Sequence, residues 1–209
     1  MNDQTKAALL LAAAGIVFFA GWKLFARTGS VSLRKAQKVA CLGDSLTAAG
    51  LYCGDLAGIL GVRSKAFGYE GQGTSVIGSH VADALAWSPD AVVVLAGVND
   101  LPAQGGAQRA ISGLTDIYAR IHAAGIPVVA VEIVPWHGYP SALGHESNTE
   151  TVNRWIRHEA NVDAVVRTSS MGDYRGDLKE KYDSGDHLHL NREGQAQLAV
   201  LIADQAFGG

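Results

Sequence analysis

The alternation of short apolar segments with longer amphipathic segments constrains the fold of this chain more than any other feature. From Lys38 onward, five short segments rich in apolar residues alternate with stretches whose apolar residues recur at helical spacing. Three of the short segments are β-branched runs, of the kind that a sheet buries on both faces. We predict strands at 38–42, 62–67, 91–96, 127–134 and 162–167, and helices near 51–60, 75–86, 105–124, 148–160 and 192–206. This order predicts an α/β fold with a mostly parallel five-stranded sheet and helices on both faces.

The composition is that of a compact globular protein. The chain has 209 residues, of which 48% are hydrophobic, with 25 Gly and only 5 Pro. A chain of this length can form one well-buried core together with a short appendage. The net charge is −3 and no long basic run lies outside the N-terminal region, which argues against a nucleic-acid partner.

Cys41 and Cys53 are the only cysteines of the chain. They lack the number and the spacing of a zinc or redox site. We expect two buried thiols that pack as small apolar side chains. The alternative is a disulfide that joins the first strand to the following helix.

The N-terminal region differs in kind from the rest. An apolar run at residues 7–22 lies between Lys6 and Lys23, and with residues 24–26 it approaches the ~20 residues that cross a bilayer. A cleaved signal peptide is the alternative, but the bulky, basic segment after the run lacks the small residues of a cleavage site. We therefore predict a membrane anchor at 1–26, a linker at 27–37 and a globular domain at 38–209.

The side of the membrane follows less directly from the sequence. Positive residues after the apolar run outnumber those before it, which favours a cytoplasmic domain. We nevertheless expect the domain to lie outside the cytoplasm. The sequence leaves its oligomeric state open.

Polar side chains gather where the predicted strands end. In a parallel α/β sheet, the carboxyl ends of the strands lie at one edge and hold the functional site. The polar segments are Gly43-Asp44-Ser45 after the first strand, 68–75 after the second, Gly97-Val98-Asn99-Asp100 after the third, Pro135-Trp136-His137 after the fourth, and 185–191 before the last helix.

These segments offer the groups that acyl transfer by a serine requires. Ser45 would attack a carbonyl carbon, His189 would accept its proton, and Asp186 would orient the imidazole. His187 competes with His189 for the role of base, and Asp44 would shape the turn before Ser45. The alternative for Ser45 itself is a turn-forming role, because Gly, Asp and Ser are common in turns.

The tetrahedral intermediate of such a reaction needs hydrogen-bond donors for its oxyanion. The backbone N–H of Ser45, a glycine N–H from the second polar segment and the side-chain amide of Asn99 could supply them. An Asn amide donates without adding negative charge, so it suits this role better than an Asp.

The motifs Gly43-Asp44-Ser45-Leu46-Thr47, Gly97-x-Asn99-Asp100 and Asp186-x-x-His189, with a glycine in the second segment, occur in the order found in the SGNH, or GDSL, hydrolases. The chain resembles this family over about residues 38–207. Around the serine it is most similar to bacterial arylesterases and the related thioesterase/lysophospholipase enzymes. The resemblance implies a flavodoxin-like three-layer α/β/α fold and ester hydrolysis without a metal or cofactor.

The second motif departs from the family pattern. Gly68 stands where relatives usually have Asn, and counting from it places the oxyanion glycine at Gly73. Gly71 is the alternative if the loop differs in length. The glycine in place of Asn leaves the identity of one oxyanion donor open and does not affect the assignment of Ser45 as nucleophile.

We therefore predict a membrane-tethered serine esterase that cleaves small carboxylic esters through an acyl-enzyme. One alternative is removal of O-acetyl groups from a carbohydrate or peptidoglycan, and another is a noncatalytic ligand-binding module. We expect Trp136 to contact the substrate and to form a shallow wall with Tyr139 and Leu143, suited to short acyl chains.

Overall fold

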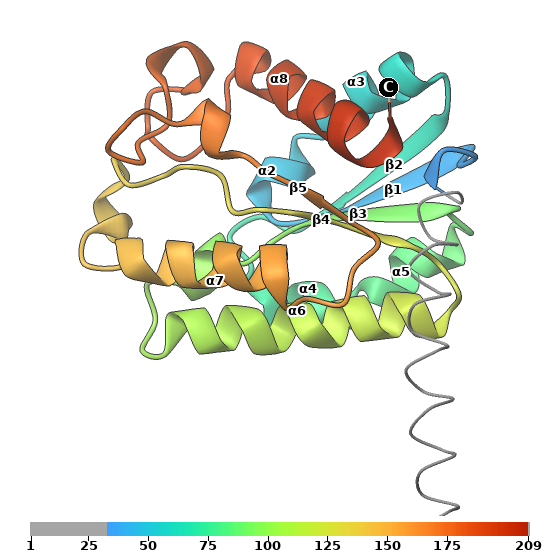
Figure 1. Ribbon diagram of the computed structural model, residues 1–209, viewed down its shortest axis with the longest axis horizontal. Coiled ribbons are helices and arrows are strands. Elements are labelled where there is room, and N and C mark those ends of the chain that lie inside the picture. Colours follow the sequence, from blue (N-terminus) through green and yellow to red (C-terminus); the bar gives the residue numbers. More distant parts are fainter. Residues whose placement is uncertain (1–32, 209) are drawn as a thin grey trace, which may run out of the picture.

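The computed structural model describes residues 33–208, which form a five-stranded parallel sheet in the order β2-β1-β3-β4-β5 (Figure 1). All adjacent strands pair in parallel. The strands are β1 (Lys38–Gly43), β2 (Arg63–Gly68), β3 (Ala91–Leu95), β4 (Val128–Val131) and β5 (Ala164–Val166). The predicted α/β fold with a parallel five-stranded sheet is confirmed.

Helices cover both faces of the sheet. Figure 1 shows α3 and α8 on one side, with α4, α5, α6 and α7 on the other. The helices are α2 (Ser45–Ala48), α3 (Leu51–Leu60), α4 (Thr74–Ser79), α5 (Val81–Ala86), α6 (Gly106–Ala123), α7 (Glu146–His158) and α8 (Arg192–Ile202), which continues as a π-helical turn, η5 (Ala203–Phe207). Short 3-10 turns are η1 (Val98–Asp100), η2 (Pro140–Ala142), η3 (Ser169–Met171) and η4 (Glu180–Tyr182).

The central strands are buried on both faces because their side chains alternate between two cores. In β1, Val39 and Cys41 pack with the residues of α3 and α8, whereas Ala40 and Leu42 pack with those of α4 to α7. Successive side chains of a strand point to opposite faces, so both faces of a central strand need apolar residues. This requirement explains the β-branched runs in the sequence.

The order of the strands places the end of β1 at a switch point. The chain passes from β1 to β2 on one side and then crosses to β3 on the other side of β1. Crevices in open α/β sheets form where the strand order reverses in this way. Gly43 ends β1 there, and a Cβ atom at Gly43 would lie 2.1 Å from the carbonyl oxygen of Leu95, so only glycine fits.

The expectation of two free thiols is wrong. Cys41 and Cys53 form a disulfide, with 6.1 Å between their Cα atoms. Both are buried in the same core cluster, because α3 packs directly on the face of β1 that carries Cys41. The Cα separation decides whether two cysteines can pair, and the sequence does not give it.

Some element boundaries also differ from the prediction. The single helix expected near 75–86 is two helices, α4 and α5, which meet at His80. The strand expected at 127–134 ends at Val131. The predicted anchor at 1–26 and most of the linker lie outside the described residues, and within residues 33–208 no helix combines the length and apolar character that a membrane span requires.

Candidate active site

Ser45 is the first residue of α2 and follows β1 after one intervening residue, Asp44. Asp44 caps the helix, since its Oδ1 accepts a hydrogen bond of 3.0 Å from the backbone N–H of Leu46. Asp44 is 1% exposed, and this burial raises its pKa to about 7 even though the Leu46 N–H lowers it. Asp44 therefore shapes the turn from beneath, as expected, while Ser45 remains half-buried and accessible.

The loop before α8 brings His189 to Ser45. The Nε2 atom of His189 lies 3.0 Å from Ser45 Oγ, and its Nδ1 atom lies 2.5 Å from Asp186 Oδ2. An Nδ1–H that donates to the carboxylate leaves Nε2 free to accept the hydroxyl proton. The structure thus joins the three predicted side chains in one chain of hydrogen bonds.

Asp186 is held as a carboxylate. Its Oδ1 accepts hydrogen bonds from the backbone N–H groups of Leu188 (3.0 Å) and His189 (2.8 Å). Partial burial raises the pKa of Asp186, but the hydrogen bonds from the side chain and backbone of His189 outweigh it and hold the pKa below its ordinary value. An ionised Asp186 suits the role of orienting an imidazole.

A second Asp–His pair in the same loop escaped the sequence analysis. Asp183 Oδ1 accepts from the N–H groups of Gly185 (2.8 Å) and His187 (2.9 Å), and its Oδ2 lies 2.9 Å from His187 Nδ1. His187 has a φ of 67°, a left-handed conformation that is unfavourable for residues other than glycine. Its ring is paired with Asp183, so His189 and not His187 contacts Ser45. The sequence could have suggested this second pair, because Asp183 and Asp186 are followed within four residues by His187 and His189.

Two of the predicted oxyanion donors lie on neighbouring loops. The Nδ2 atom of Asn99 donates a 3.0 Å hydrogen bond to the carbonyl oxygen of Gln72, which leaves the second amide hydrogen available. Gly73 directly precedes α4. Within residues 33–208, the backbone N–H groups of Ser45 and Gly73 donate no hydrogen bond to a protein acceptor. Both N–H groups can therefore serve an incoming ligand.

Gly73 is held in place by Asp100. The carboxylate of Asp100 accepts from the backbone N–H (2.8 Å) and the Oγ1 (3.2 Å) of Thr74. A Cβ atom at Gly73 would lie 2.8 Å from Asp100 Oδ1, so this position has no room for a side chain. Burial raises the pKa of Asp100, against the lowering effect of the Thr74 bonds.

An open cleft of about 500 Å³ lies beside Ser45, His189 and Asn99, and its lining does not include Gly73. Gly71, the alternative to Gly73, lines this cleft and has a φ of 68°. The lining residues are Ser45, Ala49, Glu70, Gly71, Asn99, Tyr139, Leu188 and His189.

The expectation that Trp136 contacts the substrate is wrong. Trp136 is 1% exposed and packs in the core beneath the cleft, where its Nε1 donates a 2.9 Å hydrogen bond to Thr149 Oγ1. Burial of the large indole ring in the core excludes it from the cleft surface. Tyr139 lines the cleft as expected, whereas Leu143 is 82% exposed and lies outside the lining.

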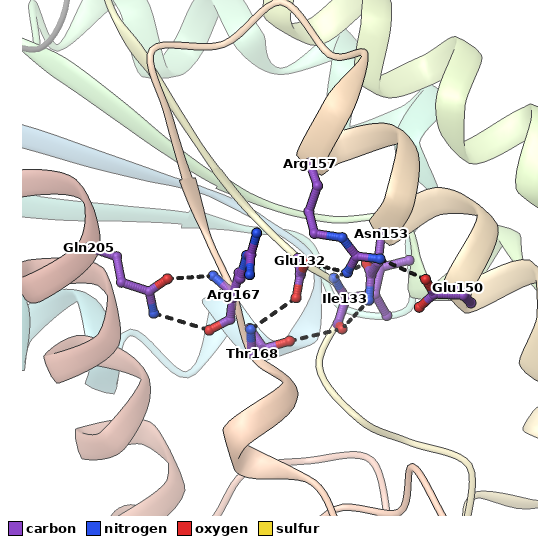
Figure 2. Close-up of polar contacts among 8 residues, drawn as sticks. All are labelled: Glu132, Ile133, Glu150, Asn153, Arg157, Arg167, Thr168 and Gln205. Atoms are coloured by element: carbon purple, nitrogen blue, oxygen red, sulfur yellow. Dashed lines mark hydrogen bonds and ion pairs between the residues drawn. The ribbon is translucent and has the colours of Figure 1, made fainter.

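A polar network lies among the end of β4, α7 and the segment after β5 (Figure 2). The guanidinium of Arg157 contacts the buried carboxylate of Glu132 at 2.7 Å and the exposed carboxylate of Glu150 at 2.6 Å. Thr168, after β5, donates from its backbone N–H to Glu132 Oε2 (3.1 Å). A second cavity of about 170 Å³ borders this network. The network ties α7 and the segment after β5 to the end of β4.

Comparison with known proteins identifies the family. Residues 41–197 match the GDSL-like Lipase/Acylhydrolase family. The chain belongs to this family. This confirms the resemblance found in the sequence, and the protein is a serine hydrolase that acts on ester bonds. No curated protein sequence matches the chain closely enough to be reported as a relative.

Several solved structures share the fold. A GDSL-like lipase from Bacteroides thetaiotaomicron has a TM-score of 0.65 and 18% identity, and the match covers 89% of this chain and 97% of that chain. A family 3 carbohydrate esterase from Clostridium thermocellum has a TM-score of 0.63 and 21% identity, with 82% and 95% covered. An acetyl xylan esterase from Geobacillus stearothermophilus has a TM-score of 0.61 and 15% identity, with 80% and 93% covered.

Proposed function

We propose that the protein is a membrane-tethered esterase that cleaves small carboxylic esters, with Ser45 as nucleophile, His189 as general base and Asp186 as the group that orients it. The observation that carries this proposal is the continuous hydrogen-bonded chain from Ser45 Oγ through His189 to Asp186. A serine hydroxyl is a weak nucleophile until an adjacent base can accept its proton. His189 Nε2 lies within reach for that transfer.

In the first half of the reaction, Ser45 Oγ attacks the ester carbonyl carbon while its proton passes to His189 Nε2. The carbonyl oxygen becomes an oxyanion, which the N–H groups of Ser45 and Gly73 and the Asn99 amide would receive. His189 then gives its proton to the alcohol oxygen as the carbon–oxygen bond breaks. The alcohol leaves, and the acyl group remains on Ser45.

In the second half, water attacks the acyl carbon and its proton passes to His189 Nε2. The same donors hold the second oxyanion. His189 returns the proton to Ser45 Oγ as the ester to Ser45 breaks, so a carboxylic acid leaves and the enzyme is restored.

The shape of the cleft supports short acyl groups. Among the described residues, its apolar lining consists of Ala49, Leu188 and the ring of Tyr139, which is too little for a long alkyl channel. A buried methylene contributes about 0.8 kcal/mol, so specificity should not rise steadily with chain length in such a cleft. We expect kcat/KM to be greatest from acetyl to butyryl esters.

Removal of acetyl groups from a carbohydrate or peptidoglycan is the second candidate. Two of the similar structures are named as an acetyl xylan esterase and a carbohydrate esterase. An open cleft that carries Glu70 and Asn99 beside the serine also suits a hydroxylated alcohol group.

We also propose that the domain lies outside the cytoplasm, held by an anchor at 1–26. The disulfide between Cys41 and Cys53 supports this location, because disulfides persist in oxidising compartments and are rare in the cytosol. Protease protection in intact cells or spheroplasts tests the location: digestion from outside is expected, and full protection there would place the domain in the cytoplasm.

The central experiment compares Ser45→Ala with Ser147→Ala, which changes an exposed serine of α7, on nitrophenyl esters from acetyl to decanoyl and on acetylated glycans. We expect Ser45→Ala to lower kcat by about 10⁴-fold or more on every hydrolysed ester, with the fold retained by circular dichroism, and Ser147→Ala to match the wild type. Hydrolysis by Ser45→Ala near the wild-type rate would refute the mechanism. The panel separates the two substrate classes.

A further inference from the structure

The charge of the cleft lining is negative. Among residues 33–208, the cleft lining contains one carboxylate, that of Glu70, and neither Lys nor Arg. Glu70 is exposed, and within residues 33–208 its carboxylate forms no ion pair. Its negative charge therefore faces the space in which a substrate of Ser45 would lie.

The backbone around Glu70 is fixed at the active site. Tyr69 donates from its N–H to the carbonyl oxygen of Gly43 (2.9 Å), at the end of β1. The ring of Tyr69 stacks on His80 with 3.9 Å between ring centroids. On the other side of Glu70, the carbonyl oxygen of Gln72 accepts from Asn99 (3.0 Å). Glu70 is therefore held between two attachments, one to the strand that leads to Ser45 and one to Asn99.

Tyr139 supplies an aromatic surface to the same cleft. Its backbone N–H donates to the carbonyl oxygen of Trp136 (2.9 Å), and its ring packs at 6.3 Å from the buried Trp136 ring. The Tyr139 ring is half-buried and packs on the core, so its position beside the cleft is fixed. The negative face of an aromatic ring attracts cations, and most strongly those that have lost part of their hydration.

We propose that the cleft is selective for esters that carry an ammonium group, with Glu70 as the specificity-determining residue and Tyr139 as the aromatic partner. This inference rests on the proposed role of Ser45 as nucleophile. Carboxylates and aromatic rings both attract an ammonium group, and one of each lines the cleft with Ser45. An anionic ester meets the charges of Glu70 and Asp186 with no lining cation to offset them.

The ammonium could belong to the alcohol, as in a choline ester, or to the acyl group, as in an aminoacyl ester. Both present the same chemistry to Glu70. The experiment therefore has one arm for each source.

The first arm measures kcat/KM for three acetate esters of similar size. They are the choline ester, its uncharged carbon analogue with a tert-butyl group in place of trimethylammonium, and the acetate of a hydroxy acid that is anionic at neutral pH. The second arm compares nitrophenyl esters of alanine and of propionate. Each ester is followed across the full-length wild type, Glu70→Gln and Glu70→Lys, so that its intrinsic reactivity cancels.

The expected result is a change in the ratio of cationic to uncharged ester. Glu70→Gln should lower this ratio about fivefold in the arm that matches the natural substrate, and Glu70→Lys should lower it further and raise the relative rate of the anionic ester. Salt at about 0.5 M should weaken the wild-type preference, since exposed charges are screened. Glu159→Gln, which removes an exposed carboxylate outside the cleft lining, is the matched control and should leave every ratio at its wild-type value.

An unchanged ratio in Glu70→Gln in both arms, or a wild-type preference for the anionic ester, would overturn the inference while leaving the esterase proposal intact. Failure of the esterase proposal has a different signature. In that case Ser45→Ala would hydrolyse the uncharged esters as well as the wild type does.

Discussion

The loop at residues 183–190 contains two Asp–His pairs that are built alike and placed differently. In each, a carboxylate oxygen contacts the Nδ1 atom of a histidine, at 2.9 Å for Asp183–His187 and 2.5 Å for Asp186–His189. The side chain of Asp183 is only 6% exposed, whereas that of Asp186 is 42% exposed. The second ring nitrogen of His189 reaches Ser45, while the Cβ and ring of His187 lie over Gly138.

This difference shows that pairing with a carboxylate does not by itself create a catalytic base. Asp183 is buried and also accepts the N–H groups of Gly185 and His187, so it fixes the path of the loop. Asp186 accepts the N–H groups of Leu188 and His189, so it fixes the imidazole that faces the serine. We infer that the Asp183–His187 pair holds the loop in the conformation that places Asp186 and His189 beside Ser45.

The largest expected effect is the loss of the base, His189. His189→Ala should lower kcat by about 10⁴- to 10⁶-fold, because within residues 33–208 no other base contacts Ser45 Oγ. Asp186→Ala should be milder by about tenfold or more, since the base remains and only its orientation and tautomer are lost. Single-turnover rates at saturating substrate measure both. Equal losses, or a larger loss in Asp186→Ala, would contradict these roles.

The ionisation state of the Asp186 carboxyl group can be tested through the pH dependence of the protein's melting temperature. Its pKa is lowered in the folded protein, so the pair contributes stability that is present above a pH of about 4 and is lost as the pH falls through the lowered pKa. The difference in melting temperature between the wild type and Asp186→Ala should therefore shrink on acidification. A difference that grows at low pH would show that Asp186 is not held as an anion.

An intermediate effect is expected for substitutions of Asp183. Asp183→Ala removes a buried acceptor from two backbone N–H groups and should cost about 2 kcal/mol of stability and about tenfold to a hundredfold in kcat, with little change in KM. Asp183→Asn keeps one oxygen for these N–H groups and should recover most of the lost kcat. A loss of melting temperature without a loss of kcat would show that Asp183 supports the fold and not the position of His189.

The smallest effect is expected at His187. His187→Gly relieves a left-handed backbone conformation that costs about 1–2 kcal/mol, but it loses the contact with Asp183 and adds flexibility to the unfolded chain. We expect these terms to offset, with a change of about threefold or less in kcat/KM. His122→Gly, at a partly exposed position in helix α6, is the control for substitution by glycine and should lose stability without loss of kcat. A loss in His187→Gly as large as that in His189→Ala would mean that His187 takes part in the reaction.

The sequence predicted the parts of the site that follow regular elements. Ser45 and Asn99 lie within four residues of the ends of buried β-branched or apolar strands, and His189 comes just before an amphipathic helix. The parallel sheet alone therefore brings them to one edge. The predictions that were wrong concern positions whose role depends on how side chains pack around those elements. Trp136 follows a strand as the others do, but its large ring was more stable in the core with Thr149 than at the surface.

The role of Asp183 could not be predicted for a related reason. It lies in an irregular loop, and its partners are backbone N–H groups whose directions depend on the left-handed φ of His187. The spacing of apolar residues, which predicts helices and strands, does not predict a left-handed backbone conformation in a loop. The same is true of Glu70, whose place in the cleft depends on the turn between Tyr69 and Gln72.

The disulfide also has a consequence for the unfolded chain. Cys41 lies in β1 before Ser45 and Cys53 lies in α3 after it, so the bond closes a ring that contains the whole nucleophile turn. For a ring of about this size, loop-closure entropy removes about 3 kcal/mol of freedom from the denatured state. A single peptide-bond cleavage within residues 42–52 would open this ring but leave the two parts of the chain joined through the cysteines.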